Sequence, residues 1–510
     1  MTSSSTNKLS LWSLSALVVG SMIGAGIFSL PATFGRATGG FGALIAWCIA
    51  GGGMLMLAFV FQTLAQRKPE LDSGVFIYAK EGFGDYLGFI AALGFWAGSC
   101  IGNVSYFVLI KSTLGAFFPV FGDGNTLSAV LLASALLWGF HLLILRGVKG
   151  AASINTIATV AKILPILLFI IVLVFAFNRD IFMLNFWGAP ESASAHIADL
   201  TQLDNYRLDN YGYVGHAATA IAASGEPESL FSQVRSTMLV TVFVFLGIEG
   251  ASVYSRYAKE RKHVGIATVL GFIGVLCLMV LITMLSYGVL LRPDLAALRQ
   301  PSMAGVLEAI VGRWGAIFIS LGLLISVLGA YLSWSLLAAE VLFAAGKNHS
   351  VPKVFGAENH NAVPSSAVWL TNLTIQLFLI LTMFSQYAFQ LALELTSSLT
   401  LIPYLLVAAY GLKLAWSGES YQPNEVGQKK ELIIALIATL YSLLMIYAGG
   451  MKYLLLSAVI YGPGTLLFIL ARREQGANRV FTPAELGLFV LIIVAAIVAI
   501  YSIATGIITI

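Results

Sequence analysis

Residues 242–254, VFVFLGIEGASVY, lie within a long apolar stretch that Gly247, Glu249 and Gly250 interrupt. A carboxylate at the centre of a membrane-spanning helix costs about 2.5–3.5 kcal/mol on insertion scales unless another group pairs with it. Glycines beside it loosen the helix and expose backbone amides and carbonyls, which a membrane protein tolerates only where they line a cavity. We therefore predict that this span is broken and that the break belongs to a binding site.

A second interruption lies in the first apolar segment, at residues 20–28, GSMIGAGIF, which carry three glycines. The spacing of Gly20 and Gly24 also suits close helix packing, so the motif alone has two interpretations. We favour a break because the sixth apolar segment repeats the pattern. Two interrupted segments, one opening each of two five-helix halves, are typical of transporters built from inverted repeats, whose substrate lies at the breaks.

The composition identifies a polytopic membrane protein. Hydrophobic residues make up 58% of the chain and charged residues 10%, whereas soluble domains have about 25% charged residues. The net charge of +4 comes without a basic run, so no nucleic-acid partner is expected. The three cysteines fall in apolar segments, which argues against a disulfide framework. Neither a metal-ligand spacing, nor a phosphate loop, nor a nucleophile motif occurs, so we expect no metal, no cofactor and no enzymatic activity.

Twelve apolar segments are predicted to span the membrane, and a thirteenth follows them. We divide the chain into a first repeat (residues 1–178), an enlarged outer loop (179–231), a second repeat (232–415) and accessory C-terminal spans (416–510). The approximate limits of the segments are 11–34, 42–65, 86–117, 127–145, 154–177, 232–257, 265–291, 314–345, 367–384, 389–415, 432–447, 453–471 and 484–508.

The lysines and arginines orient these spans. About two-thirds of the 28 basic residues fall on the side that also holds the N-terminus, and basic loops stay in the cytoplasm. This count places Lys111 on the outer side and leaves Lys162 as the basic residue within a span. We therefore predict a multi-pass protein of the bacterial inner membrane with a cytoplasmic N-terminus.

Four stretches resemble the amino acid–polyamine–organocation superfamily, within it the basic amino acid/polyamine antiporters and especially the arginine/ornithine exchangers. They are the first-span motif GSMIGAGIF, WAGSCIGN at 96–103, VFLGIEGASVYSRYAKER at 244–261 and LSWSLLAAEVLFAAGKNHSVP at 332–352. The resemblance implies an all-α fold with a 5+5 inverted-repeat (LeuT-like) core, spans 1 and 6 broken, and additional helices outside it. It implies small cationic amino acids and membrane lipid as partners, with a homodimer left open. The enlarged loop, roughly 192–228, and the thirteenth segment depart from compact members of the family.

The resemblance also implies a substrate site. The backbone of the first-span break would face the substrate's carboxylate, and two carbonyls of the sixth-span break would face its α-amino group. The residues concerned are Ile23, Gly24, Ala25 and Gly26 in the first break, and Leu246 and Gly247 in the sixth.

Three aromatic residues and one amide join this expected site. Trp334 occupies the position at which the family stacks an aromatic ring on the substrate, although a tryptophan also fills helix interfaces. Phe243 stands where the related arginine/agmatine exchanger has tryptophan, and Phe95 holds a gating position that is tyrosine in that relative. Asn103 could bind the substrate or only join two helices, and the sequence leaves both readings open.

Two charged residues are expected to couple the site to transport. Glu249 would link proton occupancy or helix packing to the cavity, the alternative being a carboxylate that only packs against neighbouring hydroxyl groups. Lys162 lies about eight residues into the fifth span. Sodium-coupled cousins of the family bind sodium in that region, so an ammonium there predicts a sodium-independent carrier. An ammonium that merely reaches back toward the lipid headgroups is the other reading.

These expectations define a secondary transporter that exchanges cationic amino acids by alternating access, arginine inward for ornithine outward. Two alternatives use the same core. One is proton-coupled uptake of lysine, arginine or histidine, and the other is exchange of an amino acid for its decarboxylated amine.

Overall fold

The structure is a computed structural model that describes residues 11–71, 74–147, 151–187, 229–249, 261–385, 387–422 and 425–508. Every regular element within these ranges is a helix, which confirms the predicted all-α class. Helices are expected in lipid, because a long apolar segment must satisfy its own backbone hydrogen bonds.

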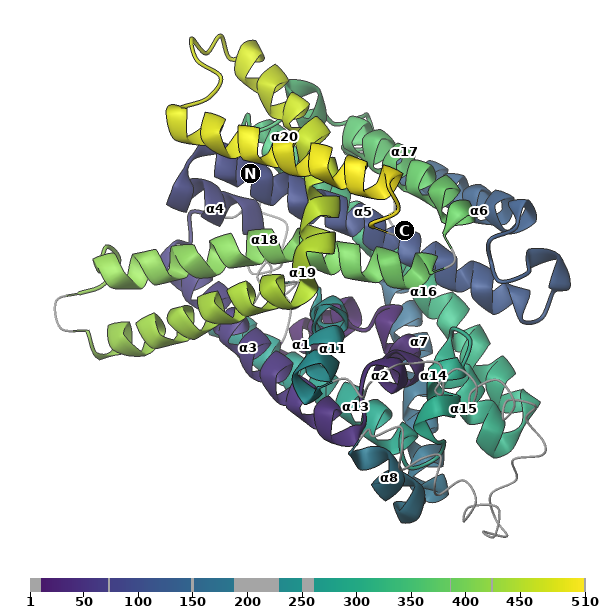
Figure 1. Ribbon diagram of the computed structural model, residues 1–510. Coiled ribbons are helices and arrows are strands. Elements are labelled where there is room, and N and C mark those ends of the chain that lie inside the picture. Colours follow the sequence, from purple (N-terminus) through teal and green to yellow (C-terminus); the bar gives the residue numbers. More distant parts are fainter. Residues whose placement is uncertain are drawn as a thin grey trace, which may run out of the picture.

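The first half of the chain begins with a broken helix and continues with longer ones (Figure 1). Its elements are α1 (Leu11–Met22), η1 (Gly26–Ser29), α2 (Leu30–Ala37), α3 (Gly40–Arg67), α4 (Val75–Phe83), α5 (Asp85–Gly115), η2 (Pro119–Phe121), α6 (Leu127–Leu145), α7 (Ala151–Ala176) and α8 (Arg179–Phe186).

The second half also begins with a helix that stops short. Its elements are α11 (Leu230–Phe245), α13 (Arg261–Ser286), α14 (Arg292–Ala297), α15 (Ser302–Val311), α16 (Arg313–Lys347), η5 (Lys353–Gly356), α17 (Ser365–Leu381), η6 (Thr382–Phe384), α18 (Ala388–Ser417), α19 (Val426–Glu474) and α20 (Pro483–Ala504).

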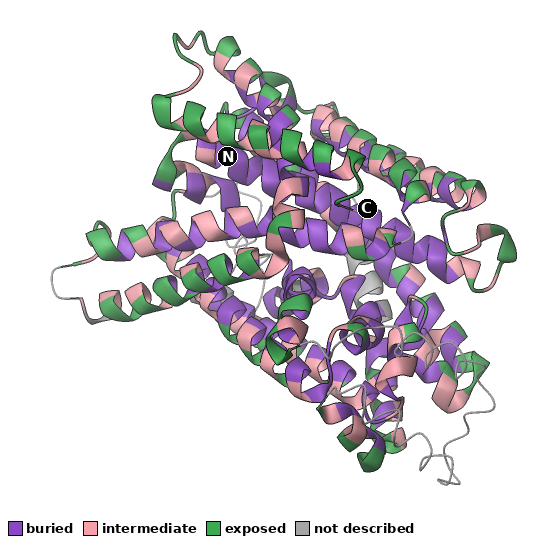
Figure 2. Ribbon diagram, viewed as in Figure 1, coloured by how far each residue is buried: buried purple, intermediate pink, exposed green. Residues whose placement is uncertain are grey.

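Helix α5 lies at the centre of the molecule. Its most apolar stretch is 94% buried, and it packs against both α16 and α18. The corresponding stretch of α20 is only 17% buried, and Figure 2 shows exposed residues along that helix. A central polar side chain on α5 therefore meets protein, whereas the exposed apolar side chains of α20 suit lipid.

The structure tests the number of spans only in part. Among the described residues, nine helices are long and apolar enough to cross a membrane. A tenth is added if Lys162–Ala176 and Arg179–Phe186, bent by 100°, count as one span. Helix α19 has 49 residues, more than twice the roughly 20 that one crossing needs. It bends at Gly450, whose φ is 75°, so α19 contains both apolar segments predicted at 432–447 and 453–471. The full count stays a prediction.

The structure bears on two expectations about the outer side, the loop at 179–231 and the position of Lys111. Helix α8 occupies the beginning of the segment predicted as a loop at 179–231, and residues 188–228 lie outside the described ranges. Counting Lys111 outside the spans is wrong. Lys111 lies in α5 with 1% of its surface exposed, because α5 continues to Gly115 and neighbouring elements cover that end.

Ion pairs fasten one end of α3 to the connection between α18 and α19. Arg67 Nη2 lies 2.8 Å from Glu425 Oε1, and its Nε lies 2.6 Å from Glu431 Oε2. The Arg67 guanidinium also stacks 3.6 Å from the centre of the Tyr421 ring. Donation by Arg67 lowers the pKa of the Glu425 carboxyl group. The connection is therefore held by charge at neutral pH.

Candidate substrate-binding site

The breaks in the first and sixth spans touch each other. Helix α1 ends at Met22, and α11 ends at Phe245. Between them, Ser21 Oγ donates a 2.9 Å hydrogen bond to the carbonyl oxygen of Gly247. Gly247 has a φ of +101°, and a Cβ atom there would lie 2.8 Å from the backbone of Ser21. Glycine is thus required twice, for the backbone conformation and for the close approach.

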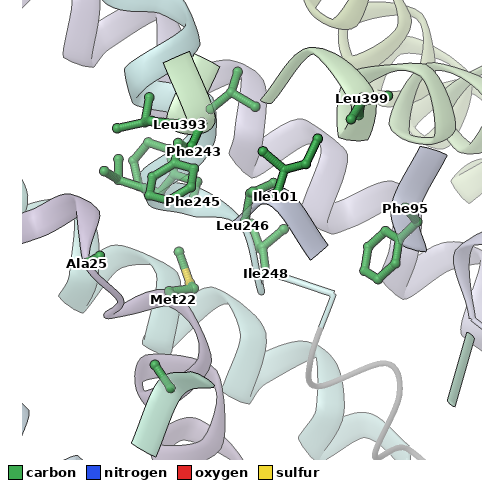
Figure 3. Close-up of a cluster of buried hydrophobic side chains, with 14 of the residues drawn as sticks. Met22, Ala25, Phe95, Ile101, Phe243, Phe245, Leu246, Ile248, Leu393 and Leu399 are labelled. Carbon is green, nitrogen blue, oxygen red and sulfur yellow. The ribbon is translucent and has the colours of Figure 1, made fainter. Parts of the chain in front are cut away.

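The two breaks also touch each other at Gly26. A Cβ atom on Gly26 would lie 2.7 Å from Val244 Cγ1 and 2.9 Å from the ring of Phe243. In Figure 3, Met22 and Ala25 of the first break lie near Phe243 and Leu246 of the sixth, with Phe95 of α5 beyond them. The predicted pair of breaks therefore exists as one contiguous region.

A small cavity lies at this junction. We call it the central cavity. It has a volume of about 20 Å³, room for about one water molecule, so side chains must move before an amino acid can enter. Its walls come from the first break, α5, the end of α11, α16 and α18. They comprise Ser21, Met22, Gly24, Gly26, Phe95, Gly98, Ser99, Gly102, Tyr106, Phe243, Val244, Leu246, Trp334, Thr396 and Thr400.

The structure brings six of the predicted site residues to the central cavity and leaves the others beside it. The six are Gly24, Gly26, Phe95, Phe243, Leu246 and Trp334. Ile23, Ala25 and Gly247 are buried next to it without lining it. Asn103 lies behind the wall, where its Nδ2 donates to Ser335 Oγ at 3.4 Å and its Oδ1 has no partner among the described residues. This position suits the helix-joining reading of Asn103 in the state described.

Glu249 fastens the sixth-span break to α18. It is 2% exposed, and its Oε2 accepts hydrogen bonds from the Gly247 N–H at 3.2 Å and from the Tyr404 hydroxyl at 2.6 Å. Its Oε1 has no partner among the described residues. The contact with a hydroxyl group matches the packing alternative for Glu249, and a role in proton coupling stays a prediction.

Lys162 braces the first-span break from α7. Its buried Nζ donates a 2.8 Å hydrogen bond to the carbonyl oxygen of Gly20. In an uninterrupted helix that carbonyl would accept from the N–H of residue 24, so the end of α1 at Met22 frees it. The ammonium therefore satisfies a backbone group that the break exposes.

Several residues of this region were not predicted. Tyr106 approaches the first break so closely that a Cβ atom on Gly24 would lie 2.9 Å from its hydroxyl oxygen. Thr396 and Thr400 bring hydroxyl groups from α18, and Tyr404 of the same helix holds Glu249. The sequence does carry one signal for the α18 residues, the run Leu395–Leu401, LTSSLTL. Its four hydroxyl residues lie in the middle of a span and therefore need polar partners.

The chain is similar over its whole length to known transporters. The family model of amino acid permeases matches residues 9–452. The arginine/ornithine antiporter of Pseudomonas aeruginosa is 49% identical, covering 100% of both chains. The L-lysine transport protein of Corynebacterium glutamicum is 40% identical over 98% of this chain and 96% of its own. The arginine/agmatine antiporter of Chlamydia pneumoniae is 37% identical over 98% of each chain.

Proposed function

Since the chain belongs to the amino acid permease family, we propose that it exchanges cationic amino acids across the membrane, arginine inward for ornithine outward. It is an amino acid antiporter, like relatives that match it from end to end. The observation that carries the choice of substrates is the 49% identity to an arginine/ornithine antiporter over both complete chains. The contact of the two helix breaks at one cavity supports a binding site for such a substrate there, once side chains have moved.

The backbone of the first break suits the substrate's carboxylate. The 3-10 helix η1 starts at Gly26, and Ala25 before it makes no side-chain cap. Free N–H groups at the start of a helical segment attract anions. On the opposite side, α11 ends at Phe245 and leaves the carbonyl groups of its last turn near Leu246. Such carbonyls suit the α-ammonium group.

Aromatic rings suit the cationic side chain. Phe95, Phe243 and Trp334 line the central cavity from three different helices. A guanidinium or ammonium group over such a ring gains about 0.5–2 kcal/mol, depending on how dry the site is. Trp334 is the half-buried member of the three, so it can shift as the substrate enters.

Alternating access would act through the contact between the breaks. The Ser21–Gly247 hydrogen bond and the Lys162–Gly20 hydrogen bond each join a break to another segment. A substrate that replaces the Ser21–Gly247 hydrogen bond, while the Lys162–Gly20 hydrogen bond persists, would let the sixth span move relative to α1. Because Lys162 supplies the positive charge, sodium is not needed. By this proposal the carrier lies in a bacterial inner membrane with its N-terminus in the cytoplasm.

Competition in ornithine-loaded vesicles tests the choice of substrates. Purified protein is reconstituted, labelled arginine is offered outside, and unlabelled arginine, ornithine, lysine, histidine and agmatine compete. We expect arginine and ornithine to inhibit most strongly. The relative from Corynebacterium glutamicum makes lysine the second candidate. Stronger inhibition by lysine than by arginine would overturn the arginine assignment in its favour.

A further inference from the structure

A second cavity follows the central cavity along the first span, α5 and α18. It has a volume of about 230 Å³ and is lined by parts of α2, α5, η6, α18 and the connections around them. On α5 the nearest lining residues of the two cavities are two positions apart, which is about 3 Å along a helix. The nearest lining residues on each segment, central cavity first, are Gly26 and Thr33, Tyr106 and Val108, and Thr396 and Leu393. The two cavities therefore follow one route.

Lys111 is a buried charge on the wall of this second cavity. Its side chain is almost completely enclosed, and its Nζ donates a 2.8 Å hydrogen bond to Thr382 Oγ1. An ammonium group has three N–H donors, and no carboxylate of the described residues lies within 4.0 Å of this one. A buried charge without an opposite charge is unfavourable, so the position calls for an anion.

Ser385 supplies an independent observation on the same wall. Its hydroxyl group is buried and has no hydrogen-bond partner among the described residues. A buried hydroxyl that donates to nothing is unfavourable relative to one that is satisfied. Ser385 directly follows η6, whose Thr382 accepts the hydrogen bond from Lys111 Nζ, so the free hydroxyl group lies three residues from the partner of the ammonium group.

The remaining charges on the wall are also mostly positive. Arg36 and Arg299 line the cavity, and Asp123 is the carboxylate among the described lining residues. Asp123 is largely exposed and lies 3.2 Å from Arg299 Nη1, so it does not neutralise Lys111. Glu394 does not line the cavity, and its Oε1 accepts from Gln390 Nε2 at 2.7 Å.

We propose that the second cavity binds a monovalent anionic group through the Lys111 ammonium and the Ser385 hydroxyl. The group is either the carboxylate of an amino acid on its way to the central cavity or a free halide ion. The carboxylate case rests on the proposed function. An amino acid would enter with its carboxylate leading and its cationic side chain trailing toward the open end, and the same carboxylate would then reach the start of η1.

Exchange measured from each side of the membrane tests this site. Wild type, Lys111→Met, Ser385→Ala and Thr382→Val are compared in ornithine-loaded vesicles, in chloride and in isethionate media. Methionine keeps the length of the buried side chain, and replacing a buried charge by an apolar group is usually tolerated. Lys452→Met is the matched control, because Lys452 lies outside the cavity and loses the same charge.

Carboxylate binding predicts that Lys111→Met raises the half-saturation concentration of arginine about fivefold to tenfold on the side facing this cavity. The maximal rate and the half-saturation on the other side stay unchanged, in both media. Ser385→Ala gives a smaller rise, and Lys452→Met gives none. Halide binding predicts instead that arginine exchange by the wild type is weaker in isethionate than in chloride. The Lys111→Met variant should then behave the same in both media.

Two results would overturn the proposal. One is that Lys111→Met matches wild type in both media. The other is that Thr382→Val reproduces Lys111→Met while Ser385→Ala has no effect, because Lys111 would then only brace η6. Failure of the proposed function looks different, since wild type itself would not exchange arginine for ornithine. In that event, the melting temperatures of purified wild type and Lys111→Met are measured in chloride and in isethionate. A wild-type melting temperature that is higher in chloride, with no such difference in Lys111→Met, shows that the cavity binds a halide. Equal wild-type melting temperatures in the two media refute the site.

Discussion

Tyr404→Phe tests whether Glu249 holds the sixth-span break to α18. The change removes the hydroxyl group that donates to Glu249 Oε2 at 2.6 Å and leaves the Gly247 N–H as the remaining donor to that oxygen. A hydrogen bond to a carboxyl group contributes about 0.5–1.5 kcal/mol when the group is neutral and about 1.5–3 kcal/mol when it is ionised, a roughly two- to 150-fold shift in an equilibrium. We expect a lower melting temperature and a slower maximal exchange rate.

Tyr441→Phe is the matched control. The Tyr441 hydroxyl is buried near the same region without a hydrogen-bond partner among the described residues, so its removal should lower neither quantity. Glu249→Gln alone and combined with Tyr404→Phe completes a double-mutant cycle, for which we expect a coupling of about 1 kcal/mol or more. Equal behaviour of Tyr404→Phe and Tyr441→Phe, or additive effects in the cycle, would refute the reasoning.

Three further predictions follow from single contacts. Lys162→Met removes the donor to the Gly20 carbonyl, and we expect exchange to slow while arginine affinity in equilibrium binding stays within about twofold; a collapse of affinity at an unchanged rate would contradict this. Trp334→Leu deletes the π-face, so affinity for arginine should fall roughly two- to thirtyfold and Trp334→Phe should restore part of it; equal affinity in the leucine variant would make Trp334 a packing residue. Arg67 lowers the pKa of Glu425, so the ion pair stabilises the fold above the ordinary carboxyl pKa of about 4.3, and this stabilisation is lost as the pH falls through the lower folded value. The melting-temperature difference between wild type and Glu425→Gln should therefore vanish in acid. A difference that persists there would show that the contact is not ionic.

The sequence predicted the breaks because their signals are local. Glycine beside a carboxylate in an apolar span has few structural explanations, and the structure ends α11 at Phe245, just before Gly247. Lys162 was also predictable, because a lysine within a span needs a partner and the first break frees a carbonyl. The family resemblance brought Phe95 and Trp334 into the prediction, and both line the central cavity.

Other features depend on contacts between distant segments and left little trace in the sequence. Lys111 lies near the end of its span, so counting loop charges placed it outside, whereas Thr382 and its neighbours bury it. Asn103 was expected at the cavity or between helices, and the structure pairs it with Ser335, 232 positions away, which no local pattern indicates. The partner of Glu249 is Tyr404, 155 positions along the chain, which no local pattern indicates.

Obligatory exchange is the central claim, and one measurement tests it directly. Arginine and ornithine each carry one net positive charge at neutral pH, so a one-for-one exchange moves no net charge and needs no ion gradient. Purified protein is reconstituted into liposomes that are either loaded with ornithine or empty, and uptake of labelled arginine is followed with and without an imposed membrane potential, sodium or proton gradient. We expect rapid uptake into loaded liposomes that is insensitive to all three gradients, and little uptake into empty ones. Equally fast uptake into empty liposomes under a proton gradient or an inside-negative potential would contradict exchange and identify the carrier as a uniporter or a proton-coupled importer.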